Sequence, residues 1–360
     1  MALPNVTAFP GPFNVYIPTF GGKVQARLIQ SFARDPKKFA VNRMPTRTPT
    51  ETLNGNWMQL RPEALARVLA TPSAYQWVDG QPFPMGNYNE QDFRARPYQC
   101  QRVALPDYLG EQTQEQAVWP IESTKIDALA HIMMTLRSQI FYNVTLTTSN
   151  HLSSHVKTAT AWSNIGGTGG FWSAGTETNP IIKRSLLNIG DQIRKDTLST
   201  VSYKDLTLVI SPTAAIGMAD SQEIHSYLAR SVFALAQIRG DKESQNGEWG
   251  LPDKLYGMGL IVDPTLRTTT GRLVVPGTTV DIMDDNTGLV IAMPGALGDN
   301  VGQVNSSFSS VHMFVYKGQE MVTKTMKDPW NQLTKLGIYE TYAMTMVTPE
   351  ASALATNLFV

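Results

Sequence analysis

The sequence predicts an α+β protein with more than one domain. Its 360 residues correspond to two or three domains at about 150 residues each. Apolar residues at helical spacing indicate a long helix at 121–142 and a second helix from Pro180 onward. Short apolar runs of strand length dominate the last third, at Leu260–Val262, Leu273–Val275, Leu289–Met293, Val311–Tyr316 and Tyr339–Val347.

Charged residues are scarce and balanced. They make up 17% of the chain, whereas about 25% is typical of soluble domains. Thirty Lys and Arg face thirty Asp and Glu, so the chain lacks the basic field of a nucleic-acid-binding protein and the self-repulsion that keeps many proteins monomeric. This composition predicts self-association.

The single cysteine, Cys100, excludes an intrachain disulfide framework and a cysteine-based zinc site. The proline-rich start lacks the pattern of a secretory signal, and no apolar run approaches the roughly 18 residues of a membrane span. We therefore expect a protein made in a reducing compartment, without membrane contact.

Residues 1–40 are expected to form an extended arm with one short helix. In GKVQARLIQSFARD, Val24, Leu28 and Phe32 recur at intervals of four residues, which is the spacing of a helical apolar stripe. Basic residues, Arg34, Lys37 and Lys38 among them, outnumber acidic ones by four in this region, and a solvated face is favoured over a specific nucleic-acid contact.

Residues 41–120 are expected to be mainly extended. Apart from a helix from Pro62 to Ala70, bulky and polar residues alternate in FRARPYQCQRVALPDYLGEQT, which predicts a long two-stranded excursion. A lone hairpin is marginal in water, so its apolar side chains need cover from this molecule or from another subunit. A local core and a subunit interface are equally favoured for the aromatic residues of this whole region, Tyr75, Trp77, Phe83, Tyr88, Phe93, Tyr98 and Tyr108.

The middle of the chain predicts two strong helices. The first has an apolar stripe, Ile126, Leu129, Met133, Leu136 and Ile140, with Thr124 and Asp127 as its first-turn cap. The second has Asn179 as its cap and a stripe of Ile182, Leu186, Ile189 and Ile193.

A buried strand and two further helices should follow. The continuous apolar run Leu206 to Ile210 indicates a strand buried on both faces. Ser211 with Pro212 predicts a short helix, and Ser221 predicts a longer one that ends at Gly240.

Motifs for catalysis are missing or have a structural explanation. The glycines at 166–170 fit a flexible connector better than a dinucleotide loop, because Trp172 occupies the place of the third glycine. His151 and His155 fit a loop, and His131 fits a structural position beside the long helix's stripe. Asp284 and Asp285 precede a glycine in MDDNTGL, which favours a tight turn between strands over a metal site. We therefore expect no enzyme activity, no cofactor and no metal.

The order of these elements resembles that of tailed-bacteriophage major capsid proteins, whose Hong Kong 97-type fold is shared with encapsulins. The resemblance rests on an arm ending near SFARDPKKF, an extended region to about residue 118, and a helix at 121–142 that is similar to the family's spine helix. NPIIKRSLLNIGDQIRKD, LTLVISPTAAIGMADSQEIHSYLARS and LYGMGLIVDP then resemble the helix, strand, helix and strand of the axial domain.

The resemblance implies a division of the chain. It assigns 1–40 to the N-terminal arm, 41–120 to the extended loop and the start of the peripheral domain, and 121–165 to the spine helix and peripheral domain. It assigns 166–325 to the axial domain and 326–360 to a strand that returns to the peripheral domain.

The resemblance also implies a function: pentamers and hexamers of this chain would form an icosahedral shell around double-stranded DNA. The alternative is an encapsulin-like compartment around a cargo enzyme. Expected partners are other copies of the chain, a scaffolding protein, a portal and a decoration protein, with weak and nonspecific contact to DNA. The location is the virion capsid, assembled in the host cytoplasm. No lysine lies between Lys38 and Lys125, so the lysine–asparagine crosslink through the extended loop that welds some family shells is not expected.

Overall fold

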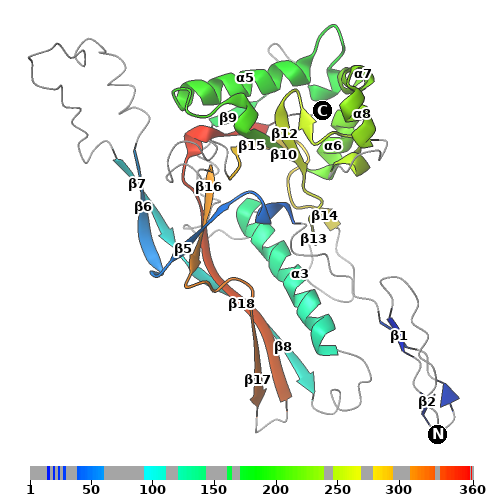
Figure 1. The fold of residues 1–360 in the computed structure, drawn as a ribbon, viewed down its shortest axis with the longest axis vertical. Coiled ribbons are helices and arrows are strands. Elements are labelled where there is room, and N and C mark those ends of the chain that lie inside the picture. The colour runs from blue at the N-terminus through cyan, green and yellow to red at the C-terminus, as the bar shows by residue number, and fades with distance from the viewer. Residues whose placement is uncertain are drawn as a thin grey trace, which may run out of the picture.

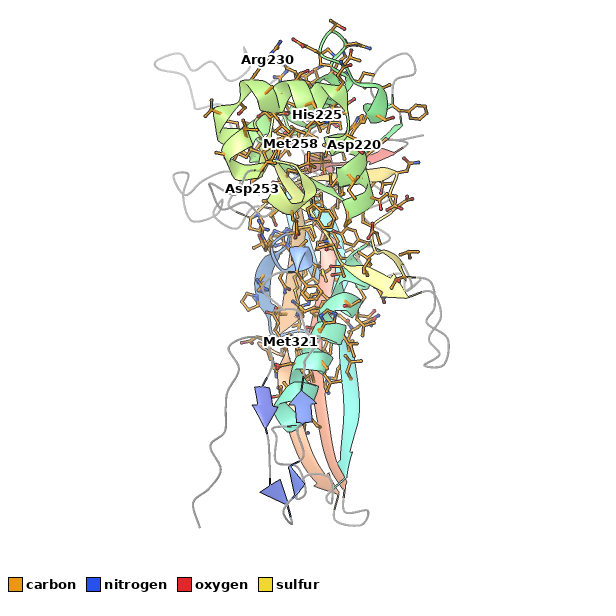
Figure 2. The ribbon with its side chains drawn as sticks, turned by 90° about the vertical axis from the view of Figure 1, so that its right-hand side faces the viewer. Asp220, His225, Arg230, Asp253, Met258 and Met321 are labelled. Atoms are coloured by element: carbon orange, nitrogen blue, oxygen red, sulfur yellow. The ribbon has the colours of Figure 1, made fainter. Side chains whose placement is uncertain are left out.

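The computed structural model describes residues 14–16, 19–20, 23–24, 27–29, 39–60, 93–110, 121–142, 160–163, 171–238, 246–268, 279–294, 309–328, 333–356 and 358. The molecule is elongated and flat: it is broad in the view of Figure 1 and narrow when turned by 90° (Figure 2). One end carries a sheet covered by short helices, and a long sheet with a single helix beside it extends from that end (Figure 1).

The sheet at the helix-covered end has six strands. Their order is β11 (Lys254–Leu255), β12 (Met258–Val262), β10 (Leu206–Ile210), β15 (Thr287–Ala292), β19 (Ser352–Thr356) and β9 (Thr160–Ser163). In β10, Leu206, Leu208 and Ile210 pack on one face, and Val209 packs on the other. Both faces of the sheet are thus covered, which explains the continuous apolar run expected for this strand.

Four helices belong to this end: α5 (Ile181–Asp196), α6 (Pro212–Ala219), α7 (Gln222–Arg230) and α8 (Val232–Ile238). The predicted stripe of α5 is fully buried, and Ser211 and Ser221 cap α6 and α7 as expected. The helix expected from Ser221 to Gly240 is broken, because Ser231 has extended backbone angles and separates α7 from α8.

The N-terminus of α5 is capped by a distant carboxylate rather than by Asn179. Glu223, which is 3% exposed, accepts hydrogen bonds from the backbone N–H groups of Ile182 and Lys183, both at 2.8 Å. It also accepts one from the Tyr256 hydroxyl at 2.9 Å. The Asn179 side chain instead accepts from Arg184. A helix N-terminus attracts negative charge, so Glu223 of α7 fixes the start of α5.

The long sheet is organised around β18 (Leu333–Met346). One edge of β18 pairs with β8 (Gln101–Gly110), and the other pairs with β17 (Val322–Asp328) and then with β16 (Val311–Tyr316). Beyond β16 lies β5 (Thr46–Thr50), which runs parallel to it. The sheet therefore joins segments from the start, middle and end of the chain.

The helix α3 (Ile121–Tyr142) lies along this sheet (Figure 1). Leu129, Met133 and Ile140 of its predicted stripe are buried in the core that the helix shares with β16 and β18. At its C-terminal end, the Tyr142 hydroxyl donates to the buried Asp263 carboxylate at 2.9 Å, which ties the helix to the residue that follows β12.

A separate two-stranded ribbon consists of β6 (Asn54–Leu60) and β7 (Phe93–Gln99). It projects from the side of the molecule (Figure 1). The expected strands between residues 93 and 113 are present as β7 and β8, but they do not pair with each other, because Cys100 is buried between them and the chain enters the long sheet there.

The described part of the N-terminal arm is extended and contains strands where a helix was expected. β1 (Asn14–Tyr16) pairs with β4 (Arg27–Ile29), and β2 (Thr19–Phe20) pairs with β3 (Lys23–Val24). Gly21 and Gly22 separate β2 from β3, and a glycine pair is typical of a two-residue hairpin turn. The turn signal therefore outweighs the spacing of three apolar residues.

The remaining described elements are short. β13 (Leu266–Thr268) pairs with β14 (Thr279–Asp281). Single 3₁₀ turns occur at Ala40–Asn42 (η2), Trp172–Ala174 (η5), Tyr203–Asp205 (η6), Gly247–Trp249 (η7) and Pro349–Ala351 (η8). Among the described residues, no helix is both long and apolar enough to cross a bilayer.

The two sheets interleave along the chain. β9 and β19, from ranges expected to belong to the peripheral domain, lie in the six-stranded sheet. β16 and β17 lie in the long sheet, and the expected boundary at residue 325 falls inside β17. The expected helix at 62–70, the run at 273–275 and the glycines at 166–170 lie outside the described residues.

The Glu223 cap gives a test of the helix-covered end. Glu223→Gln removes the charge at the start of α5 and one acceptor, so the free energy of unfolding should fall by about 1–3 kcal/mol, the usual worth of a hydrogen bond to a charged group. Urea unfolding measures it. Glu248→Gln makes the same chemical change at an exposed position of η7 and should leave stability unchanged; an equal loss in both variants would contradict the role of Glu223.

Candidate functional site

A buried ion pair joins α3 to β18. The side chain of Arg137 is 1% exposed and that of Glu340 is 0% exposed. The guanidinium donates through Nη2 to Oε2 of Glu340 and through Nε to Oε1 at 3.4 Å. It also lies 5.6 Å from the centre of the Tyr342 ring. Burial acts to lower the pKa of Arg137, but the negative charges of Glu340 and Glu320 outweigh it and raise that pKa, so the guanidinium stays charged.

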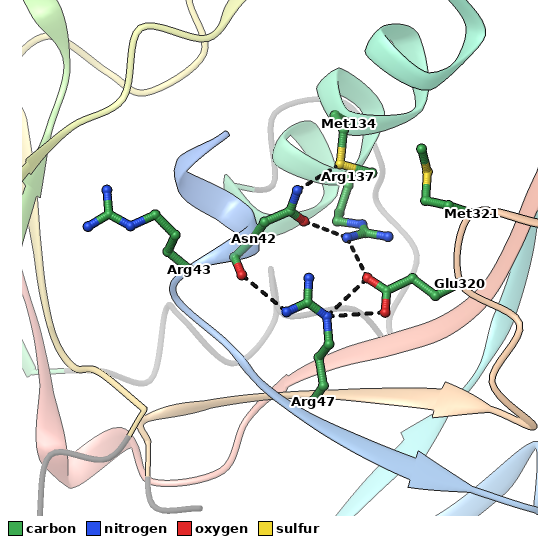
Figure 3. A pocket seen from close by; sticks show the side chains of 7 residues that line it. All are labelled: Asn42, Arg43, Arg47, Met134, Arg137, Glu320 and Met321. Carbon is green, nitrogen blue, oxygen red and sulfur yellow. Dashed lines mark hydrogen bonds and ion pairs between the residues drawn. The ribbon is translucent and has the colours of Figure 1, made fainter. Parts of the chain in front are cut away.

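Two further elements meet this pair through Asn42 and Glu320 (Figure 3). The Asn42 side chain, at the end of η2, accepts from Arg137 Nη1 at 2.5 Å and donates to the sulfur of Met134 at 3.0 Å. Glu320, on the connection between β16 and β17, accepts from Arg137 Nη1 at 3.0 Å and from Arg47 Nε at 3.1 Å. These side chains border a cavity of about 390 Å³, also lined by Arg43 and Met321.

The ribbon is held to the long sheet by an aromatic cluster. Tyr98 of β7 stacks on Phe314 of β16, with ring centres 4.1 Å apart and planes 9° apart. Trp57 of β6 lies 4.8 Å from the His312 ring and 5.7 Å from the Phe314 ring. The Tyr98 hydroxyl also shares a hydrogen bond with the Thr50 hydroxyl at 2.9 Å.

His312 is a buried imidazole at the centre of this cluster. It is 3% exposed and shares a hydrogen bond with the Thr48 hydroxyl at 3.1 Å. Burial lowers the pKa of the imidazole from its ordinary value of 6.5 to about 4. Burial likewise raises the pKa of the Cys100 thiol to about 11, so this cysteine is held as a neutral thiol.

The opposite face of the ribbon is open and uncharged. Alternate residues of a strand share a face, and the register pairs Asn54 with Gln99, Asn56 with Pro97, and Met58 with Ala95. All six residues are exposed, and Met58 is 59% exposed. We call this set the outer ribbon face.

Of the predicted residues, His131 and Asp284 do not line the cavity. His131 packs edge-on against Phe39, with ring centres 5.4 Å apart. Asp284 accepts from the backbone N–H of Asn286 at 3.0 Å, which is the expected turn between β14 and β15. Tyr98 packs inside its own subunit, and Phe93 and Tyr108 lie on β7 and β8. Tyr75, Trp77, Phe83, Tyr88, Arg34, Lys37, Lys38, His151 and His155 lie outside the described residues.

The arrangement is suited to holding protein surfaces together. Within the described ranges, no three His, Cys, Asp or Glu side chains gather in a way that could hold a metal ion. Three charged side chains in the cavity, Arg47, Arg137 and Glu320, are bound to one another, and the ribbon cluster consists of aromatic rings, including the His312 imidazole, and hydroxyl groups. The Arg137–Glu340 contact had no signal in the sequence, because the partners are 203 residues apart.

No family model matches the sequence, and no curated protein matches it. Solved structures do match. A phage-related protein from Bordetella bronchiseptica has a TM-score of 0.55 and 10% identity, over 89% of this chain and 93% of its own. A chain in the capsid structure of the cyanophage P-SCSP1u has a TM-score of 0.50 and 11% identity, over 95% of this chain and 92% of its own. At such identities the likeness concerns the fold, and it confirms the α+β, Hong Kong 97-like fold expected from the sequence.

The buried pair predicts non-additive mutant effects. Arg137→Met leaves Glu340 buried without its countercharge and should lower the free energy of unfolding by about 3–5 kcal/mol. The double variant Arg137→Met/Glu340→Leu removes both charges and should recover most of that loss. Urea unfolding of the wild type, the single variants Arg137→Met and Glu340→Leu, and the double variant measures the coupling; simple addition of the two single losses would refute it.

His312 predicts a defined pH dependence. Its pKa is lower in the folded chain than in the unfolded chain, so folding favours the neutral imidazole. The part of the free energy of unfolding that depends on the neutral imidazole is fully present above pH 6.5 and is lost as the pH falls from 6.5 through about 4. By about pH 4, the free energy of unfolding of the wild type should have fallen by roughly 3 kcal/mol more than that of His312→Gln, since one pKa unit corresponds to about 1.4 kcal/mol. Urea unfolding between pH 7 and pH 4 tests this. His225→Gln, at an exposed position of α7, serves as the control and should keep the wild-type slope.

Proposed function

We propose that this chain is the major capsid protein of a tailed phage and assembles into an icosahedral shell around double-stranded DNA. The observation that carries the proposal is a fold shared over 95% of the chain with a cyanophage capsid subunit. The balanced, charge-poor composition supports it, because surfaces that become buried between subunits are depleted in charge.

The outer ribbon face is the contact that we assign to a neighbouring subunit. The inner face of the ribbon packs on the subunit's own long sheet through Trp57 and Tyr98. The outer face carries no charge, so a second copy can cover it without the cost of burying an unpaired ion. Covering Met58 and Pro97 also removes apolar area from water, which stabilises association.

The helix-covered end is the part that we assign to the axial domain, at the centre of pentamers and hexamers. It presents exposed apolar side chains on its helices: Leu187 on α5 is 44% exposed, Ile216 on α6 is 51% exposed, and Val232 on α8 is 85% exposed. Contacts around a closed ring would cover such residues. The long sheet with α3 then corresponds to the peripheral domain.

The other partners follow from the same proposal. A scaffolding protein, a portal and a decoration protein would act during or after assembly in the host cytoplasm. Contact with packaged DNA would be weak and independent of sequence, with Arg34, Lys37 and Lys38 as the basic candidates, because a neutral chain neutralises few phosphates.

Electron microscopy of the purified protein tests the shell. Closed particles built of five- and six-subunit rings are expected, and particles from producing cells should protect double-stranded DNA from nuclease. Material that stays at the 39.7 kDa of the single chain at high concentration would refute the shell. Particles that enclose a protein cargo and no DNA would refute the viral assignment.

Met58 tests the outer ribbon face. Met58→Lys places a charge on that face and should raise the protein concentration needed for assembly by about tenfold or more, since a buried unpaired charge costs well over 1.4 kcal/mol. Met58→Leu keeps the apolar contact and should assemble like the wild type. Light scattering during assembly measures both variants, and circular dichroism checks that they are folded. Normal assembly of Met58→Lys would exclude this face as an interface.

A further inference from the structure

Arg47 and Arg137 form a socket for a carboxylate at the cavity described above, and Glu320 occupies it from within the subunit (Figure 3). One carboxylate oxygen of Glu320 receives hydrogen bonds from both guanidinium groups, and the second receives one from Arg47 Nε at 3.1 Å. Arg47 also donates through Nη1 to the backbone oxygen of Asn42 at 3.4 Å. Two guanidinium groups that converge on one carboxylate make a strong anion site.

Charge balance suits the socket to a carboxylate. Glu340 neutralises Arg137 inside the core, and Glu320 neutralises the remaining positive charge of Arg47. If Glu320 leaves, Arg47 and Arg137 retain one net positive charge, beside an open cavity of about 390 Å³ that Arg43 also lines. A carboxylate from another molecule has both the charge and the space to replace it.

The backbone that delivers Glu320 is strained. Lys317 and Met321, on either side of it, have φ angles of 45° and 52°, and Gly318 has 67°. Residues other than glycine rarely adopt this left-handed region, and each such residue costs free energy that the surroundings must offset. Backbone hydrogen bonds hold the turn in this conformation, among them those from Lys317 N–H to the Thr50 oxygen at 2.8 Å and from Glu320 N–H to the Gly318 oxygen at 2.9 Å.

The side chains of Glu320 and Arg47 are also accessible to solvent. The side chain of Glu320 is 25% exposed and that of Arg47 is 46% exposed, whereas Arg137 beneath them is 1% exposed. Among the described residues, nothing accepts a hydrogen bond from Arg47 Nη2. An incoming carboxylate can thus bind Arg47 before Glu320 withdraws.

We propose that the Arg47–Arg137 socket is a subunit-contact site, in which a carboxylate side chain of a second copy replaces Glu320 during assembly. The inference rests on the proposed function, which supplies the second copy at high local concentration. The exchange conserves charge, since one carboxylate enters as one leaves. Glu320 is then an internal competitor that restrains assembly.

The exchange is tested by the direction in which two variants change the concentration needed for assembly. Glu320→Ala removes the competitor and should lower the concentration needed for assembly by about threefold, whereas Arg47→Gln weakens the socket and should raise it by about threefold, as expected for a partly exposed ion pair. If Glu320 only braces its own subunit, both variants weaken assembly, and the proposal fails. If the wild type forms no particles at all, the failure lies with the proposed function instead.

A second measurement tests the socket without assembly and keeps the proposal falsifiable if Glu320→Ala is unstable. In Glu320→Ala subunits, sodium acetate should raise the melting temperature by about 1 °C or more over sodium chloride at equal ionic strength, because a ligand that binds the folded state stabilises it. The wild type, with its socket filled, and Arg47→Gln/Glu320→Ala should show no preference for acetate. Equal responses of Glu320→Ala to both salts would overturn the carboxylate socket.

Discussion

Arg137 and Glu340 place two charges inside the apolar layer between α3 and β18, and the arrangement of the long half of the molecule follows from that placement. A charge this deeply buried needs its partner in one geometry, so α3 cannot slide or turn on the sheet without separating the pair. Asn42 and Glu320 add the end of η2 and the β16–β17 connection to the same guanidinium. Such a pair adds little net stability but specifies one packing.

The helix-covered end obeys a different constraint. Alternate residues of β10, β12 and β15 face two cores, one shared with α5 and α6 and one shared with α3 and β16. One sheet thereby connects the two halves, and the Tyr142–Asp263 hydrogen bond reinforces the connection. Because these strands are apolar on both faces, the alternation of polar and apolar side chains does not by itself specify their register.

The sequence was informative where the signal is local. Helical spacing predicted α3 and α5, and a continuous apolar run predicted β10. The contacts that define the site could not be predicted from the sequence. Arg137 and Glu340 are 203 residues apart, and the local pattern around either residue gives no information about its partner. The same limit applies to the Glu223 cap, 41 residues from Ile182, and to the break at Ser231. In the arm, the helical spacing of Val24, Leu28 and Phe32 predicted a helix, but the segment contains short strands, and the glycine pair between β2 and β3 was the better signal.

The two proposed contacts differ in physical character, and a shell of identical chains needs both kinds. In the proposed shell, contact through the apolar residues of the outer ribbon face would depend on apolar area, which is indifferent to direction, so it would tolerate the differences in angle between five- and six-subunit rings. A guanidinium socket demands defined hydrogen-bond geometry, so it distinguishes a correctly placed neighbour from a misplaced one. Because the socket is already filled by Glu320, this second contact forms only when a neighbour's carboxylate competes successfully. Association through the ribbon can therefore precede the directional contact, and misplaced copies can separate before it forms.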